Sequence, residues 1–371
     1  MEQVKRVIRM LISVIIAACL LSGCKNNQTS YDLNAISSNL MEGNEIFAFN
    51  IFKRLNAEDA GKNIFISPLS ISTALAMTYN GAGSATAEAM AKTLGYTEIE
   101  LADLNTSYKN LLAYLNSADP KVRLDISNSI WFREGEKIRQ DFLERNKDIY
   151  NAYIEELDFS DSGAADVING WIERATQGKI DKMIDHPIPE DVVMYLINAI
   201  YFKGQWMKQF DKKLTFTGVF NTEEGKKHEV QMMSKKGETE YGEVHNTKIV
   251  RLPYGDGKIS MYCILPAEGI KINAYIAGFN ADKWKELKQS IEKREEVILN
   301  LPRFKMEYGI KKLNDSLVAL GMGEAFSGSA DFSGIRDGIF ISRVLHKAVI
   351  EVNEEGSDAA AATVVEMMKA A

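Results

Sequence analysis

The side chains best suited to metal binding or covalent catalysis are few in this sequence, and they are scattered. The four histidines (His186, His228, His245 and His346) include no two at the spacing that places zinc ligands on one face of a helix. The sequence contains no Cys-x-x-Cys, His-Glu-x-x-His, Gly-x-Ser-x-Gly or phosphate-binding glycine loop. We therefore predict no catalytic residues, no metal ligands and no cofactor, and we expect that the protein is not an enzyme. A serine–histidine pair formed by distant residues is the one catalytic arrangement that the sequence leaves open.

The segment 351–371 combines local preferences that rarely occur together. Four alanines at 359–362 favour helix, whereas the Thr-Val-Val that follows them favours strand. In an extended segment, alternate side chains share a face, and this face would carry Ser357, Ala359, Ala361 and Thr363. Side chains this small can enter between two strands without clashing with a packed core. The composition alone leaves two interpretations open, a flexible alanine-rich tail or a segment that becomes a strand.

The first residues have the pattern of a bacterial export signal. Lys5, Arg6 and Arg9 precede an apolar run from 11 to 21 that is shorter than the roughly 20 residues needed to span a bilayer. Leu21-Ser22-Gly23-Cys24 resembles the lipobox of bacterial lipoproteins. We expect a signal peptide at 1–23, lipid attachment at Cys24 and a polar tether at 24–43. This places the protein on the outer membrane or cell surface, whereas an ordinary secretory signal cut elsewhere would make it a secreted protein.

Cys263 is the remaining thiol of the mature chain under this interpretation. It lies in the apolar run 259–265, so we expect a buried, small hydrophobic side chain there.

The bulk composition argues for one folded domain at 44–371. The chain has 371 residues with 46% apolar content, and no Ser/Gly-rich or charge-rich linker divides it. A net charge of −7, with basic residues gathered only in pairs, argues against nucleic-acid binding. We expect a monomer.

The elements that must position the C-terminal segment are a mixture of helices and long strands. Strands are predicted at 124–132, 192–202, several places in 215–265, 297–306 and 339–352. Helices are predicted from about Glu45, from Pro68 after a Ser67 cap, and at 85–94, 101–115, 141–150, 165–175, 283–293 and 310–320. No βαβ unit repeats, so the predicted fold class is α+β.

Several of these segments resemble one protein family. The run Glu354-Glu355-Gly356-Ser357-Asp358-Ala359-Ala360-Ala361-Ala362-Thr363 is similar to the hinge of the reactive-centre loop of serpins. Residues 63–71, 198–206, 252–254, 301–304 and 346–348 resemble further serpin segments in the same order. The resemblance begins near Asn44 and implies a large, mostly antiparallel central sheet, two smaller sheets and about eight or nine helices.

The same resemblance implies roles for residues that otherwise look ordinary. Ser67, Ser70, Asn198 and His346 match the family's shutter cluster, and Trp206 and Arg303 match the breach, where loop insertion starts. Without the resemblance, His346 would be a satisfied core histidine and Trp206 a core aromatic. Arg303 and Glu354, which match positions that pair by charge, would be surface residues.

The implied activity is inhibition of serine proteases, with cysteine proteases as a wider option. The protease cuts the loop, and the hinge at 354–365 then inserts into the central sheet while the enzyme is still attached. A non-inhibitory member that acts as a surface binding or chaperone-like protein is the alternative.

The family's usual loop length places the reactive bond at Ala370–Ala371. If the chain end is itself a cut, the bond follows Ala371. Alanine in the specificity pocket favours elastase- or subtilisin-like targets, whereas Lys369 would suit trypsin-like and Met368 chymotrypsin-like enzymes. The chain stops inside the loop, so we expect that the family's C-terminal strands are missing, through either cleavage or truncation.

Overall fold

The computed structural model describes residues 31–370. The predicted signal peptide, Cys24 and Ala371 lie outside the described residues. The helices are α2 (Ser38–Glu58), α3 (Pro68–Tyr79), α4 (Ser84–Leu94), α5 (Leu101–Ser117), α6 (Gln140–Tyr150), α7 (Ala164–Ala175), α8 (Ile272–Ala277), α9 (Ala281–Gln289) and α10 (Asn314–Leu317), with short turns η1 (Leu33–Ala35), η2 (Lys212–Leu214), η3 (Val318–Met322) and η4 (Gly323–Phe326). The strands are β1 (Val122–Arg133), β2 (Tyr153–Leu157), β3 (Val192–Gln205), β4 (Phe216–Asn221), β5 (Lys227–Val244), β6 (Thr247–Tyr254), β7 (Ile259–Leu265), β8 (Glu292–Pro302), β9 (Phe304–Lys312), β10 (Ile339–Val352) and β11 (Gly356–Lys369).

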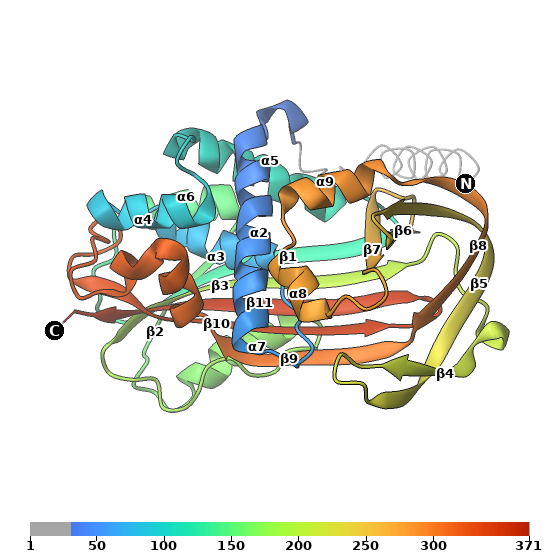
Figure 1. The fold of residues 1–371 in the computed structure, drawn as a ribbon. Coiled ribbons are helices and arrows are strands. Elements are labelled where there is room, and N and C mark those ends of the chain that lie inside the picture. Colours follow the sequence, from blue (N-terminus) through green and yellow to red (C-terminus); the bar gives the residue numbers. More distant parts are fainter. Residues whose placement is uncertain (1–30, 371) are drawn as a thin grey trace, which may run out of the picture. The chain divides into compact units, whose positions relative to one another are not determined.

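The central sheet has six strands in the order β2-β1-β3-β11-β10-β9. Its neighbours are antiparallel except for the parallel pair β1 and β2. Figure 1 shows β11, the last strand in the sequence, running between β3 and β10 in the interior of this sheet. The alanine-rich segment is therefore a strand with a hydrogen-bonded neighbour on each side.

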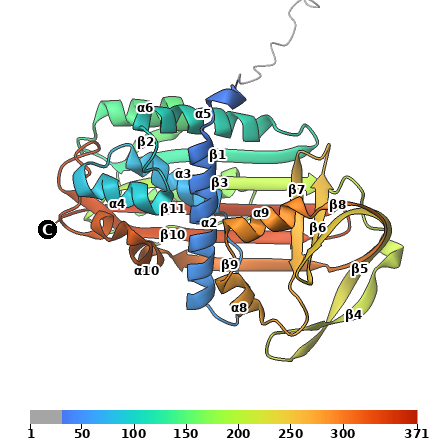
Figure 2. The ribbon, with the colours of Figure 1, turned by 45° about the horizontal axis from the view of Figure 1, so that its top comes forward.

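Helices cover both faces of the central sheet. Alternate residues of a strand point to opposite faces, and Met194 and Leu196 join the core formed with α2 to α6. Tyr195 and Ile197 face the other way and pack in the same core as Ile168 of α7. Figure 2 shows α5 and α6 lying along the side of the sheet formed by β1 and β2. A strand placed in this sheet must therefore bury both of its faces.

The second sheet has five strands built around β5. The first residues of β5 pair with β4, its middle residues with β8 and its last residues with β6. Strand β6 in turn pairs with β7. The family resemblance implies two smaller sheets; among the described residues, the continuous strand β5 joins the two sets of strands into one five-stranded sheet. A shared core that includes Met233, Leu252 and Val352 connects this sheet to one end of the central sheet.

The α+β class is confirmed, and β10 has the predicted bounds. The first predicted helix starts too late: α2 begins at Ser38, because the hydroxyl of Ser37 accepts a hydrogen bond from the amide of Asn39 and caps it. Leu40 is fully buried, so this early turn belongs to the core.

Two other predictions of helix are wrong around the strands β8 and β9. The helix predicted at 283–293 ends at Gln289, since residues from Glu292 onward pair with β5. The predicted helical face includes Ile310, but this residue lies in β9, at an irregularity between two stretches that pair with β10. The neighbouring helix α10 contains only Asn314–Leu317, and the short helix α8 is not among the predicted helices.

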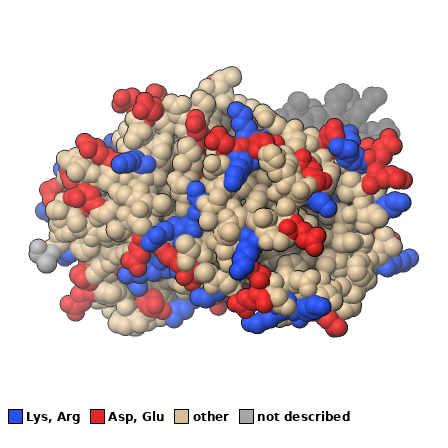
Figure 3. All heavy atoms as spheres, viewed as in Figure 1, with Lys and Arg blue, Asp and Glu red and all other residues tan. Residues whose placement is uncertain are grey.

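The surface carries mixed charge. Figure 3 shows basic and acidic side chains interspersed over the visible face rather than gathered by sign. Among the described helices, none has a stretch long and apolar enough to cross a bilayer.

Candidate functional site

The predicted hinge lies at the start of β11 and in the turn before it. Glu354 and Glu355 occupy the turn, and Gly356 to Thr363 form the first part of the strand. Ser357 is opposite Gly204 of β3 and Val352 of β10. The face with Ser357, Ala359, Ala361 and Thr363 is buried as predicted, and the opposite face is buried as well, since Ala360 and Ala362 are almost inaccessible. The side chains on both faces of this part of β11 must therefore be small.

The strand begins at a close approach between two backbones. A Cβ atom added to Gly356 would lie 2.0 Å from the carbonyl oxygen of Gly204, which is far inside van der Waals contact. The hydroxyl of the next residue, Ser357, lies 2.6 Å from the hydroxyl of Tyr254. Only a small side chain fits at this entrance.

Trp206 and Tyr254 form the wall of the entrance. Their rings stack with centroids 4.4 Å apart and planes 16° apart. The indole Nε1 of Trp206 donates to the carbonyl oxygen of Asn353 at 2.8 Å, and its backbone amide donates to Glu355 at 2.9 Å. Trp206 thus contacts the chain that leads into β11, at the position that the family resemblance assigns to the breach.

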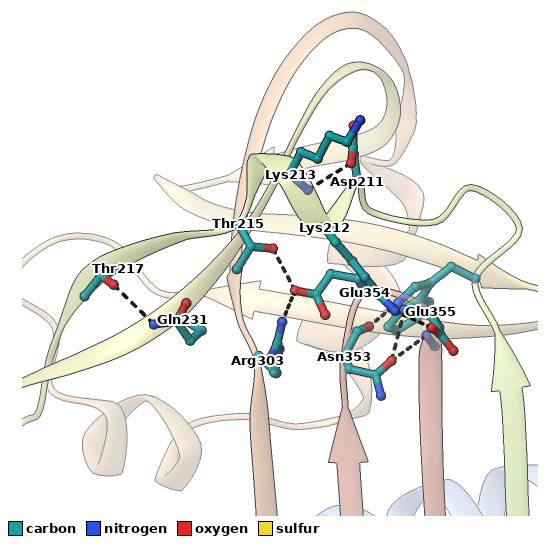
Figure 4. A network of polar contacts seen from close by, with 12 residues as sticks. Asp211, Lys212, Lys213, Thr215, Thr217, Gln231, Arg303, Asn353, Glu354 and Glu355 are labelled. Atoms are coloured by element: carbon teal, nitrogen blue, oxygen red, sulfur yellow. Dashed lines mark hydrogen bonds and ion pairs between the residues drawn. The ribbon is translucent and has the colours of Figure 1, made fainter.

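Charged residues hold the turn before β11 (Figure 4). Glu354 forms an ion pair with Arg303 and accepts a hydrogen bond from the hydroxyl of Thr215 at 2.7 Å. Burial alone would raise the pKa of Glu354, but these two donors outweigh it and lower the pKa to about 2. Glu355 pairs with Lys212 at 2.5 Å. Thr215 and Lys212 lie in a turn between β3 and β4. Nothing in the sequence indicates that residues of this turn contact the hinge.

His346 is fully buried and takes part in a directed chain of hydrogen bonds. Its Nε2 accepts from the backbone amide of Ser67 at 3.1 Å, so in the neutral ring the proton is on Nδ1. Nδ1 lies 2.8 Å from the hydroxyl of Thr363, which in turn lies 2.9 Å from the hydroxyl of Ser70. Burial lowers the pKa of His346 to about 3, so the ring is neutral at physiological pH.

The chain of hydrogen bonds continues into β3 and β1. The hydroxyl of Ser70 donates to the carbonyl oxygen of Asn198 at 3.4 Å. The side-chain amide of Asn198 donates to Asn128 at 2.8 Å, and Asn128 donates to the carbonyl oxygen of Tyr150 at 2.7 Å. The four residues predicted for the shutter are brought together. Thr363, predicted only as part of the hinge, joins them, and Asn128 was missed because a polar residue within a strand gives no distinct signal.

Of the residues predicted for the reactive bond, Met368, Lys369 and Ala370 lie at or just past the far end of β11. Met368 and Lys369 are its last residues, and the backbone amide of Ala370 donates to the carbonyl oxygen of Gly338 at 2.8 Å. Over residues 31–370, no group of three or more His, Cys, Asp or Glu side chains is arranged to hold a metal ion. Cys263 is half-buried rather than fully buried, and burial raises the pKa of its thiol to about 11.

Comparison with known proteins gives a consistent result. The family model "Serpin (serine protease inhibitor)" matches residues 42–371. Human serpin B8 is 37% identical over 337 residues, which cover 88% of this chain and 88% of that protein. A leukocyte elastase inhibitor from Xenopus laevis is 36% identical over 335 residues, with coverage of 85% and 86%. The structure of reactive-loop-cleaved human thyroxine-binding globulin superimposes with a TM-score of 0.83 at 29% identity, covering 89% of this chain and 98% of that one.

Proposed function

The chain belongs to the serpin family, and on this premise we propose that it inhibits serine proteases as a suicide substrate. The protease would recognise the loop that contains Ala370 and attack it. The cut loop would then insert into the central sheet as β11. The observation that carries this proposal is the position of β11 between β3 and β10, with both faces buried.

The chemical step is the first half of ordinary proteolysis. The serine oxygen of the protease attacks the carbonyl carbon of Ala370 and forms an ester, while the peptide bond to Ala371 breaks. The proton from the serine passes through the protease's own base to the amino group that leaves on Ala371. No residue of the inhibitor is needed for this step, which is consistent with the absence of a catalytic motif in the sequence.

Insertion supplies the free energy that stops the reaction at the ester. A strand in the interior of a sheet gains hydrogen bonds on both edges and buries its side chains, as β11 does against β3 and β10. The linked protease is carried along with the end of the strand. If its active site is distorted before water reaches the ester, the complex persists, so inhibition depends on insertion being faster than hydrolysis.

A gel experiment tests the proposal. The full-length protein is mixed with an elastase, and we expect a band at the summed mass that resists SDS. The loop-cleaved protein should also unfold at a much higher temperature than the uncut protein. If members of every serine protease class cut the loop and none gives an adduct, the inhibitor proposal is wrong, and a non-inhibitory surface binding protein is the better account.

We also propose a target class and a location. Alanine at 370 favours a protease with a small specificity pocket, and one similar protein carries the name leukocyte elastase inhibitor. A lipid anchor on Cys24 would hold the inhibitor at the cell envelope. We expect labelled fatty acid to be incorporated into the full-length protein and Cys24→Ser to move it to the soluble fraction; unchanged membrane fractionation of this variant would contradict the anchor.

A further inference from the structure

A pocket of about 150 Å³ lies where β5 pairs with β6 along one edge and with β8 along the other. Part of its wall is apolar and includes Trp206 and Leu252. The rest carries more cations than anions: Lys208, Lys235, Arg251 and Lys293, with Glu238 and Glu240. None of these residues belongs to β11, and the proposed function gives the pocket no role.

Both carboxylates of the pocket already have a partner. Glu238 lies 3.3 Å from the ammonium of Lys208, and Glu240 lies 2.7 Å from the guanidinium of Arg251. Lys293 is opposite Glu240 across the pair of strands β5 and β8, but within residues 31–370 it forms no ion pair, because Glu240 is bound to Arg251. The pocket therefore has an excess of positive charge.

Lys235 is half-buried in this pocket and has no anionic partner among the described residues. Its ammonium lies over the ring of Phe210, 4.7 Å from the ring centre. Burial lowers the pKa of Lys235, and the nearby charge of Lys208 lowers it further. Removing a charge from water without a counter-charge is unfavourable, so an anion that enters the pocket would be stabilised there.

We propose that this pocket binds one small tetrahedral oxyanion, phosphate or sulfate, on Lys235 and Lys293. An ammonium group has several N–H donors for the oxygens of such an anion. The apolar wall beside Trp206 keeps water from part of the site, which strengthens an ionic contact. A long polyanion is disfavoured, because the pocket is small and the further charges of the polymer would meet Glu238 and Glu240 at its border.

Calorimetric titration of the whole chain with inorganic phosphate tests the site, with chloride used to hold the ionic strength constant. We expect saturable binding of a single phosphate and no binding of chloride. A parallel titration with glycerol phosphate distinguishes the source of the anion: tighter binding than inorganic phosphate assigns the site to a phosphate ester, and weaker binding assigns it to the free ion. A response that does not saturate, or an equal response to chloride, would overturn the inference.

Substitution of the two free lysines should weaken the binding of phosphate. Lys235→Gln should lower the affinity about ten- to hundredfold, the range for a hydrogen bond to a charged group. Lys293→Gln, at an exposed position, should lower it about two- to fivefold. The matched control is Lys236→Gln, because Lys236 is the next residue of β5, is exposed and does not line the pocket. An equal loss in Lys235→Gln and Lys236→Gln would reduce the effect to net charge and overturn the inference.

Chemical labelling locates the anion without any substitution. An amine-acylating reagent is added with and without phosphate, and mass spectrometry measures the modification of each lysine. We expect phosphate to protect Lys235 but not Lys226, which pairs with Glu224 in an exposed turn. Binding of phosphate that leaves Lys235 unprotected would place the anion elsewhere and overturn the inference. These measurements use no protease, so failure of the proposed function would not alter them.

Discussion

The two halves of β11 are fixed in the sheet by different physical means. From Gly356 to Thr363 the side chains are small, and close contact with the backbone of β3 leaves no room for larger ones. From Val364 to Lys369 they are larger, the pairing shifts on both edges, and ion pairs to Arg343 and Glu136 hold the end. Volume is the main requirement in the near half, from Gly356 to Thr363, where Asp358 alone is charged and pairs with Lys179, whereas ion pairs fix both charged side chains of the far half.

This difference has consequences for how substitutions act. Steric exclusion is steep, since an added side chain either fits or blocks the strand. Charge pairing at a partly exposed site is gradual, since water and salt replace part of a lost partner. Substitutions in the near half should decide whether insertion occurs, and those in the far half how long its product lasts.

The largest expected effect comes from bulk at the entrance. Ser357→Arg places a long cation where the side chain is 5% exposed and contacts Tyr254. Burying it without a partner costs several kcal/mol, so insertion should slow by more than about tenfold and the protein should become a substrate. The measurement is the number of inhibitor molecules consumed per elastase inactivated.

Two other arginine substitutions complete that experiment. Lys369→Arg, at the far end, keeps the cation and should retain the original stoichiometry. Ser117→Arg, on the exposed end of α5, controls for added charge. If Ser357→Arg still traps elastase at the original stoichiometry, the steric account of the near half is wrong.

An intermediate effect is expected where the two halves meet. Thr363→Val keeps the shape but removes the hydroxyl that lies between His346 and Ser70. Two buried polar groups lose a partner, so the unfolding free energy of the cleaved protein should fall by about 1–3 kcal/mol. Denaturant unfolding measures it. The uncut form should change much less, and an equal loss in both forms would show that Thr363 occupies the cluster before cleavage.

The smallest effect concerns the charged turn before the strand. The pKa of Glu354 is about 2 in the folded protein and near 4.5 when unfolded. Its stabilising contribution is therefore complete above about pH 4.5 and is lost as the pH falls toward 2.

Comparison with Glu354→Gln isolates this contribution. The stability difference between the two cleaved proteins should be on the order of 1–2 kcal/mol at pH 7 and should shrink as acid is added. A difference that stays constant between pH 7 and pH 3 would mean that the ion pair with Arg303 does not provide it.

Elements with strong local patterns could be predicted from the sequence. Ser67 followed by Pro68 defines the start of α3, and the apolar run of β10 gave its bounds. Predictions failed where tertiary pairing overrides local preference. Ile310 stands at helical spacing from Leu313 and Leu317, yet its strand pairs with β10 and forms no helix.

The candidate site divides in the same way. The small side chains of the near half and the match to a known hinge are visible in the sequence. The partners of the far half are not, because Glu136 lies more than 200 residues before Lys369 and only the sheet brings them together. Charge on a single residue carries no information about its partner, so Arg343 and Glu136 could be found only from the structure.

Asn314, at the start of α10, forms hydrogen bonds with the backbone of β10 that do not depend on the neighbouring strand β11. Its side chain accepts from the amide of Val344 at 3.0 Å and donates to the carbonyl oxygen of Ser342 at 2.7 Å, while the carbonyl oxygen of Val344 accepts from Leu313 at 2.8 Å. Both backbone groups of Val344 are thus satisfied by residues outside β11. In hydrogen exchange, the Val344 amide should be protected to the same degree whether or not the loop has been cut, which makes it an internal reference for the amides beside it.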